Sequence, residues 1–307
     1  MKFLCPNKSM FSPKGIELLN TKHEVDFREL TQNEFEQIAF NYEGLFIRFN
    51  HNINSKILNE YSKVKYILCP TTGLDHINLD LVKKFKIELY SIKGEPFLKD
   101  ITATAELAIL FILLSQRNVI SSFVHTKNNL WDPSLFKGNE LKSKVLGIIG
   151  LGRLGKIIAD VINKFGVKVI FYDINDAIKS STHESVSLNY LLSTSDIISV
   201  NASLDCNTNY ILDENEFSLM KKGVSIINTS RGALINSEIL IKYLDNQKVK
   251  NAFLDVIENE NAPNNKLIKY SKECKNLFIS PHIGGTTFES IEKTDIFLIN
   301  KFLNNCT

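Results

Sequence analysis

Short β-rich runs alternate with helical patterns along most of the chain. In the first series, strands are expected at residues 2–5, 44–49, 64–69 and 87–92. A second series begins near Lys144, with strands expected at 145–149, 167–172, 197–200, 224–228, 252–256 and 277–279. Because strands and helices alternate, the pattern predicts an α/β protein with parallel sheets covered by helices.

Two helix starts in the first series carry capping signals. Ser12 precedes Pro13 as N-cap and first helical residue. Thr31 and Glu34 form a capping box, and apolar residues follow it at helical spacing. Further helices are expected at 54–61 and 79–85.

An apolar helix and an irregular segment separate the two series. Residues 102–117 are apolar nearly all round, which predicts a helix buried on several sides. Residues 119–141 have no regular period and contain the only tryptophan, Trp131, so we interpret them as a wrapping arm. The last stretch, 286–303, is helical again.

The 307 residues suit two domains. We predict one domain from residues 1–96 with 288–307 and a second from residues 97–287.

Composition excludes several classes of function. With 36 basic and 34 acidic residues the net charge is +2, so nothing favours nucleic acid or an anionic membrane surface. The longest apolar run, 107–114, is far shorter than the ~20 residues of a membrane span. The five cysteines are odd in number and lack metal-site spacing. They predict a cytoplasmic protein with no disulfide framework and no metal site.

A glycine motif follows the first strand of the second series. Gly150, Gly152 and Gly155 form GxGxxG, with Arg153 and Leu154 between the last two, at the start of a helical pattern. Such a turn brings a pyrophosphate to the N-terminus of a helix, so we predict a dinucleotide site. Asp173 ends the next strand, where a carboxylate binds the ribose hydroxyls and repels a 2′-phosphate. We therefore predict NAD rather than NADP.

Three polar residues follow later strands of the same series. Arg231, Glu260 and His282 come just after the strands at 224–228, 252–256 and 277–279. Ligands of open α/β sheets bind at the carboxyl ends of the strands, so the three side chains are expected to converge near the cofactor. Each alone could be an ordinary loop residue.

The chemistry of this trio suits hydride transfer to a 2-oxo acid. An arginine binds the carboxylate and polarises the carbonyl. A histidine supplies the proton to the developing alkoxide. A neighbouring glutamate selects the histidine tautomer and favours its protonated form.

These motifs resemble the D-isomer-specific 2-hydroxyacid dehydrogenase family over nearly the whole chain. The matching pieces are residues 147–155, 227–233, Asp255 with Val256, Glu260, and 281–285. The resemblance implies two Rossmann-like or flavodoxin-like doubly wound domains, an active site in the cleft between them, and a homodimer. Residues 1–96 with 288–307 would form the substrate-binding domain, and residues 97–287 the NAD-binding domain.

The resemblance also implies roles for individual residues. Arg231 would bind substrate, and Glu260 would partner the acid/base His282. Asp255, Thr229 and Ser230 would hold the nicotinamide amide.

Further positions are implied by the same resemblance. Thr72 and Gly73 would bind the substrate carboxylate through backbone N–H groups, and Arg48 matches a position facing the cleft. Asn201 begins Asn-Ala-Ser where the family usually has His-x-Pro, which affects the surroundings of the cofactor ribose.

Together these features predict a cytoplasmic, NAD-dependent oxidoreductase that interconverts a 2-oxo acid and a D-2-hydroxy acid. One alternative is an NAD(H)-sensing interaction protein of the same fold. A phosphoglycerate dehydrogenase-like activity remains open as another. A formate dehydrogenase is disfavoured, because those enzymes pair the histidine with glutamine rather than with a residue like Glu260.

Overall fold

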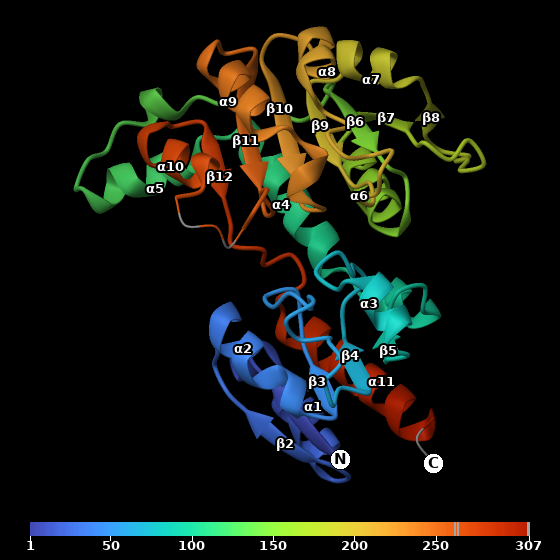
Figure 1. Ribbon diagram of the computed structural model, residues 1–307. Helices are drawn as coiled ribbons and strands as arrows, with labels where there is room; N and C mark the ends of the chain where they lie inside the picture. Colours follow the sequence, from blue (N-terminus) through green and yellow to red (C-terminus); the bar gives the residue numbers. More distant parts are fainter. Residues whose placement is uncertain (261, 263, 306–307) are drawn as a thin grey trace. The chain divides into compact units, whose positions relative to one another are not determined.

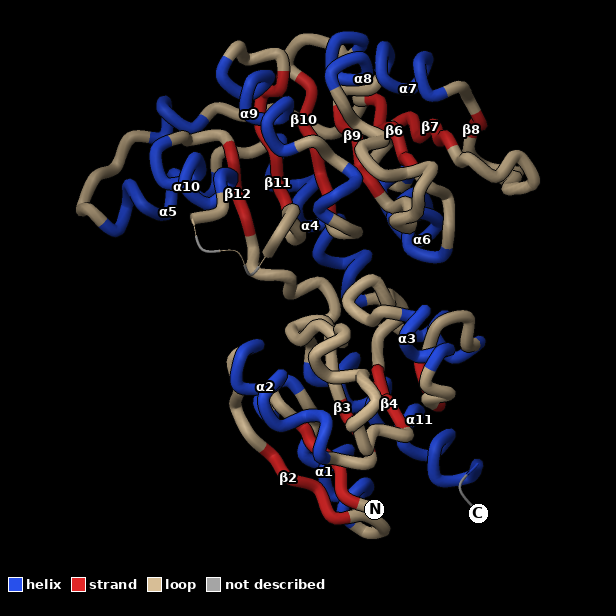
Figure 2. The backbone as a smooth tube through the Cα atoms, viewed as in Figure 1, coloured by secondary structure: helices blue, strands red, loops and turns tan. Residues whose placement is uncertain are grey.

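The computed structural model describes residues 1–260, 262 and 264–305. The chain divides into two compact units. Unit 1 comprises Met1–Ile101 and Thr286–Thr307, and unit 2 comprises Thr102–Gly285. The boundaries expected from the sequence lie a few residues away, after residues 96 and 287. Each unit is a parallel sheet with helices on both faces (Figures 1 and 2).

Unit 1 has a five-stranded parallel sheet in the order β2-β1-β3-β4-β5, a flavodoxin-like arrangement. Its strands are β1 Lys2–Cys5, β2 Glu24–Phe27, β3 Gly44–Phe46, β4 Tyr66–Cys69 and β5 Glu88–Ser91. Its helices are α1 Pro13–Asn20, α2 Gln32–Ile38, α3 Leu79–Lys84 and α11 Phe288–Asn305.

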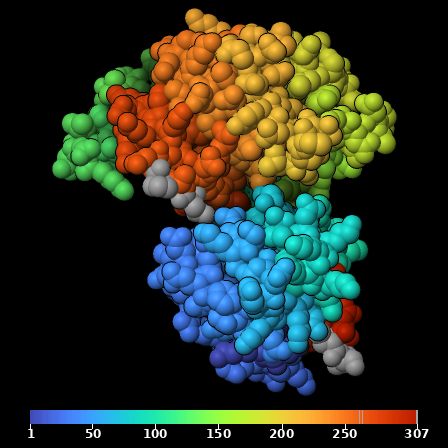
Figure 3. Space-filling view, viewed as in Figure 1, coloured from blue at the N-terminus to red at the C-terminus, as the bar shows by residue number. Residues whose placement is uncertain are grey.

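The helices of unit 1 bury a separate apolar core on each face of the sheet. Helices α1 and α11 cover one face, where the ring of Phe302 meets the rings of Phe3 and Tyr90 at 5.5 and 5.2 Å. Helices α2 and α3 cover the other face through Phe35 and Val82. The C-terminal helix thus completes a unit built from the first hundred residues, as Figure 3 shows where red residues lie against cyan ones.

The helix expected at 54–61 is absent, and these residues form turns. The Asn54 side chain accepts a hydrogen bond from the Lys56 N–H, and the Asn59 side chain accepts one from the Tyr61 N–H. Asparagine side chains that bond local backbone groups in this way compete with helical hydrogen bonds. These local side-chain bonds therefore override the apolar spacing at this site.

Unit 2 has a seven-stranded parallel sheet in the order β12-β11-β10-β9-β6-β7-β8. Its strands are β6 Val145–Ile149, β7 Lys168–Tyr172, β8 Glu184–Ser185, β9 Ile197–Val200, β10 Val224–Asn228, β11 Val249–Leu254 and β12 Leu277–Ile279. The order reverses between β6 and β9, which is the Rossmann arrangement and confirms the predicted fold class.

Helices again cover both faces of the unit 2 sheet. One core packs α4 and α6 on the sheet, and the other packs α7, α8, α9 and α10. The helices are α4 Ala103–Gln116, α5 Val119–Lys127, α6 Arg153–Asn163, α7 Leu188–Thr194, α8 Glu214–Leu219, α9 Ser237–Asp245 and α10 Lys266–Glu273. The segment interpreted as an arm contains α5, which extends away from the sheet of unit 2 (Figure 1, green).

Candidate active site

The glycine loop joins β6 to α6 at the switch point of the unit 2 sheet. Gly150 has φ +92°, which favours glycine, and a Cβ there would lie 2.8 Å from the Ala202 nitrogen. A Cβ on Gly155 would lie 2.3 Å from the Gly150 oxygen, so α6 packs directly on the turn. Nothing lies within 4 Å of a Cβ built on Gly152.

This geometry fits a dinucleotide. Gly152 leaves the backbone open for a pyrophosphate, and Arg153 and Leu154 belong to the first turn of α6. The first N–H groups of a helix have no partner inside the helix and carry its positive dipole end. Asn201 lies across the switch point, where its N–H donates to the Ile149 carbonyl.

Asp173 lies just past β7 and is tied to the glycine loop. Its Oδ2 accepts a hydrogen bond from the Leu151 N–H at 2.9 Å, and its Oδ1 accepts one from the Asn175 N–H at 3.0 Å. The carboxylate therefore lies at the end of β7, beside the turn that would bind the pyrophosphate.

The turn after β10 carries Arg231. Asn228 anchors it, because its side chain donates to the Arg231 carbonyl at 2.8 Å and accepts from the Ser230 N–H at 3.0 Å. The Ser230 hydroxyl donates to the Val200 carbonyl, which ties this turn to the end of β9. Thr229, which lies between Asn228 and Ser230 in the chain, is buried.

Gly232 brings the arginine turn against the segment that carries Glu260. A Cβ on Gly232 would lie 1.9 Å from the Ile257 carbonyl carbon and 2.3 Å from the Glu258 nitrogen. Glu258 fastens the same segment, because its side chain accepts hydrogen bonds from Tyr210 and Ser237. The local sequence carries no signal for these roles of Gly232 and Glu258.

Glu260 and His282 form a pair in unit 2. Glu260 Oε2 lies 2.9 Å from His282 Nδ1, although the residues are 22 positions apart. A carboxylate only accepts, so Nδ1 carries the proton in this bond. Because β10, β11 and β12 are neighbours in the sheet, Arg231, Glu260 and His282 follow three adjacent strands.

Asp255 holds the backbone of the histidine loop. Its carboxylate is buried and accepts hydrogen bonds from the Ser280 hydroxyl and from the N–H groups of Ile283 and Gly284. The backbone of His282 has φ +55°, an uncommon conformation for a residue with a side chain. Asp255 thus supports a strained loop, a role that its place in the sequence does not reveal.

Arg48 follows β3 in unit 1 and forms a buried ion pair. Its Nη2 lies 2.6 Å from Asp295 Oδ1 and also donates to the Thr294 hydroxyl. Burial raises the pKa of Asp295, whereas the Arg48 guanidinium, which stays protonated in proteins, favours the carboxylate. We conclude that the two charges compensate each other.

The turn after β4 carries Thr72 and Gly73. Thr72 is exposed, and neither its N–H nor that of Gly73 has a hydrogen-bond partner in the described part of the chain. Two adjacent N–H groups of this kind can bind a carboxylate.

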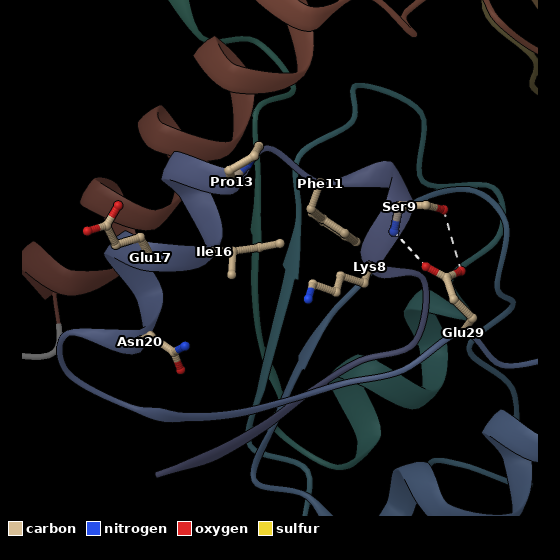
Figure 4. Close-up of a pocket in the computed structure, with 8 residues that line it drawn as sticks. All are labelled: Lys8, Ser9, Phe11, Pro13, Ile16, Glu17, Asn20 and Glu29. Atoms are coloured by element: carbon tan, nitrogen blue, oxygen red, sulfur yellow. Dashed lines mark hydrogen bonds between the residues drawn. The ribbon is translucent and has the colours of Figure 1, made fainter.

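A surface hollow of about 710 Å³ lies elsewhere in unit 1. Phe11 and Ile16 point into it, and Ser9 bonds to Glu29 at its edge (Figure 4). No candidate residue lines this hollow, although Phe11 also stacks under Arg48, whose guanidinium carbon is 5.2 Å from the ring centre.

The described residues contain neither a metal-binding cluster nor a membrane-spanning helix. No cluster of three or more histidine, cysteine or acidic side chains could hold a metal ion there. Within the same residues, no helix has the length and hydropathy of a membrane span.

The unit 2 sheet, its glycine turn at the switch point and the polar residues past adjacent strands define an NAD-binding Rossmann oxidoreductase. The chain belongs to the D-isomer-specific 2-hydroxyacid dehydrogenase family, whose NAD-binding domain matches residues 109–284. NAD is accordingly its cofactor.

Individual relatives and structures agree with this assignment. A hydroxypyruvate reductase of Thermotoga maritima is 31% identical over 290 residues, covering 94% of this chain and 93% of the relative. A glyoxylate reductase of Thermococcus litoralis is 34% identical over 252 residues, covering 78% and 73%. The Aquifex aeolicus D-lactate dehydrogenase, solved with NAD and lactic acid, has a TM-score of 0.84 at 26% identity, covering 99% and 94%.

Proposed function

We propose that this protein reduces a 2-oxo acid to a D-2-hydroxy acid with NADH. The observation that carries the proposal is the 2.9 Å contact between Glu260 and His282. These two residues follow β11 and β12, the two strands next in order to β10, which precedes Arg231. Arg231 binds the substrate carboxylate and polarises the 2-oxo group. His282 supplies the proton, through Nε2, to the oxygen that becomes the hydroxyl. Bound NADH supplies the hydride.

The remaining cofactor and substrate residues belong to the same proposal. Gly150, Gly152, Arg153, Leu154 and Gly155 receive the pyrophosphate. Asn201, Thr229, Ser230 and Asp255 border the nicotinamide and its ribose. Thr72 and Gly73 bind the substrate carboxylate.

The ion pair between Arg48 and Asp295 affects which substrates the protein accepts. Because Asp295 already neutralises its guanidinium, Arg48 offers hydrogen bonds but no net positive charge to a second anionic group. We therefore propose that the substrate tail is uncharged, which disfavours a phosphorylated substrate.

The decisive experiment is NADH oxidation with a panel of 2-oxo acids. The panel includes glyoxylate, hydroxypyruvate, and the matched pair 2-oxopentanoate and 2-oxoglutarate. We expect turnover, and kcat/KM about tenfold or more higher for 2-oxopentanoate, which corresponds to ~1.4 kcal/mol. NADH binding without turnover on any acid would favour the alternative, an NAD(H)-sensing protein. A preference for 2-oxoglutarate would overturn the role of Arg48.

Asp173 is proposed to set the preference for NADH over NADPH. Replacing it by asparagine keeps an oxygen for the Leu151 N–H but removes the charge that repels a 2′-phosphate. We expect the NADH/NADPH ratio of kcat/KM to fall about tenfold or more, with Asp173→Ala also weakening NADH binding. Equal use of both cofactors by the wild type would contradict this placement of Asp173.

We also propose a cytoplasmic homodimer. The four described cysteines are free, which supports a reducing compartment. The arm exposes Phe123, Trp131 and Leu135, and apolar side chains of this size favour cover by a second copy of the chain. Light scattering that gives the mass of a single chain would exclude the dimer, and fractionation of cells tests the compartment.

A further inference from the structure

Cys69, the last residue of β4, contacts the turn that carries Thr72 and Gly73. Cys69 Sγ lies 3.1 Å from the Thr71 hydroxyl and 3.4 Å from His76 Nε2. The Thr71 hydroxyl in turn donates to the Gly73 carbonyl at 2.8 Å. Cys69 and His76 are both buried, whereas Thr72 in the same turn is exposed.

Only one arrangement of protons satisfies all three contacts. The Gly73 carbonyl cannot donate, so the single proton of the Thr71 hydroxyl is used there. Cys69 must then donate its proton to Thr71, and its sulfur must accept one from His76 Nε2. Burial raises the pKa of the Cys69 thiol to about 11, so the thiol keeps the proton that this order requires.

The far end of the turn is fixed by backbone bonds instead. The His76 carbonyl accepts a hydrogen bond from the Ile53 N–H at 2.8 Å, beside a parallel bridge between Ile53 and Ile77. Between Cys69 and this bridge, the side-chain contacts fix the Gly73 carbonyl. The bond from the Thr71 hydroxyl to the Gly73 carbonyl closes a ring that contains the Thr71–Thr72 and Thr72–Gly73 peptides. These two planar peptides carry the N–H groups of Thr72 and Gly73, so the closed ring limits how those N–H groups can turn.

We propose that Cys69, Thr71 and His76 form a hydrogen-bonded brace that aims the N–H groups of Thr72 and Gly73 at the substrate carboxylate. The three are positioning residues, and none of them needs to touch the substrate. The inference rests on the proposed function, since it assigns the carboxylate to this turn.

Cys5 provides a matched control for Cys69. It is the last residue of β1 in the same sheet, it is equally buried, and no hydrogen bond among the described residues joins it to the turn. Cys69→Ala and Cys5→Ala each remove a buried thiol, but only the first breaks the brace. Cys69→Ser keeps a donor and an acceptor at the same position.

Steady-state kinetics of these variants test the brace. We expect Cys69→Ala to raise KM for the 2-oxo acid about fivefold to tenfold, with kcat and the KM for NADH changed less than about twofold. Cys5→Ala should leave both KM values unchanged, and Cys69→Ser should recover much of the loss. Equal KM values for Cys69→Ala and Cys5→Ala would overturn the proposal, as would a Cys69→Ser variant no better than Cys69→Ala.

A second measurement needs neither activity nor a variant. Long-range ¹H–¹⁵N NMR spectra of the wild type distinguish the two neutral tautomers of each histidine. We expect His76 to be protonated at Nε2, and protonation at Nδ1 alone would refute the brace. If the tautomer is the expected one and no 2-oxo acid is reduced, the proposed function fails while the brace stands.

Discussion

Replacing His282 by asparagine is expected to lower kcat/KM for the 2-oxo acid about 10²- to 10⁴-fold, the usual contribution of a general acid. Asparagine tolerates the positive φ of this position better than alanine, so the loop held by Asp255 should keep its shape. The dissociation constant of NADH should change little. Stopped-flow and steady-state kinetics measure both quantities.

Glu260→Gln tests whether the pair works as one unit. Glutamine keeps the size and a hydrogen-bond acceptor but loses the negative charge that faces His282 Nδ1. We expect a loss smaller than that of His282→Asn, and a double variant no slower than His282→Asn alone. Losses that multiply in the double variant would show that the two residues act independently.

The same unit contains a matched control pair. His183 Nε2 lies 2.9 Å from Asp160 Oδ1, the same distance as in the Glu260–His282 pair, but neither residue follows β10, β11 or β12. His183→Asn should lower the melting temperature while leaving kcat/KM nearly unchanged. If His183→Asn lowered kcat/KM as much as His282→Asn does, the loss in His282→Asn would reflect damage to the fold rather than loss of proton transfer.

Local signals in the sequence explain most of what could be predicted. The glycine loop and the capping box at Thr31 are encoded within a few residues, and the structure confirms both. The sequence predicts β10, β11 and β12 because each of these strands contains a short apolar run. Their adjacency in the sheet, which brings Glu260 to His282, follows from the fold class.

Features that depend on distant partners were not predicted. The edge strand β2 has the sequence Glu-Val-Asp-Phe, with only two apolar residues, so it lacks the apolar run that marks the central strands. Asp295 meets Arg48 across 247 residues, and no local spacing signals that contact. The family resemblance implies that Asp255 binds the cofactor. Its hydrogen bonds to the N–H groups of Ile283 and Gly284 depend on the folded loop, so the sequence does not predict them.

Arg231→Lys is expected to raise KM for the 2-oxo acid about 10- to 100-fold, the cost of losing hydrogen bonds to a charged group. Lysine keeps the charge but cannot form the planar fork that binds a carboxylate with two parallel bonds. NADH affinity should change little, because Asn228 anchors the turn through the backbone, although Arg231 Nη1 also donates to the Ser230 carbonyl at 2.7 Å.

Two further variants separate substrate binding from the shape of the turn. Arg117→Lys, on an exposed arginine of the same unit, should leave KM unchanged. Gly232→Ala keeps Arg231 but forces a Cβ to within 1.9 Å of the Ile257 carbonyl carbon, so it should displace Arg231 and Glu260 together and lower kcat as well as raise KM. If Arg231→Lys instead lowered kcat with KM unchanged, the arginine would act on the transition state alone, and another group would have to bind the substrate carboxylate.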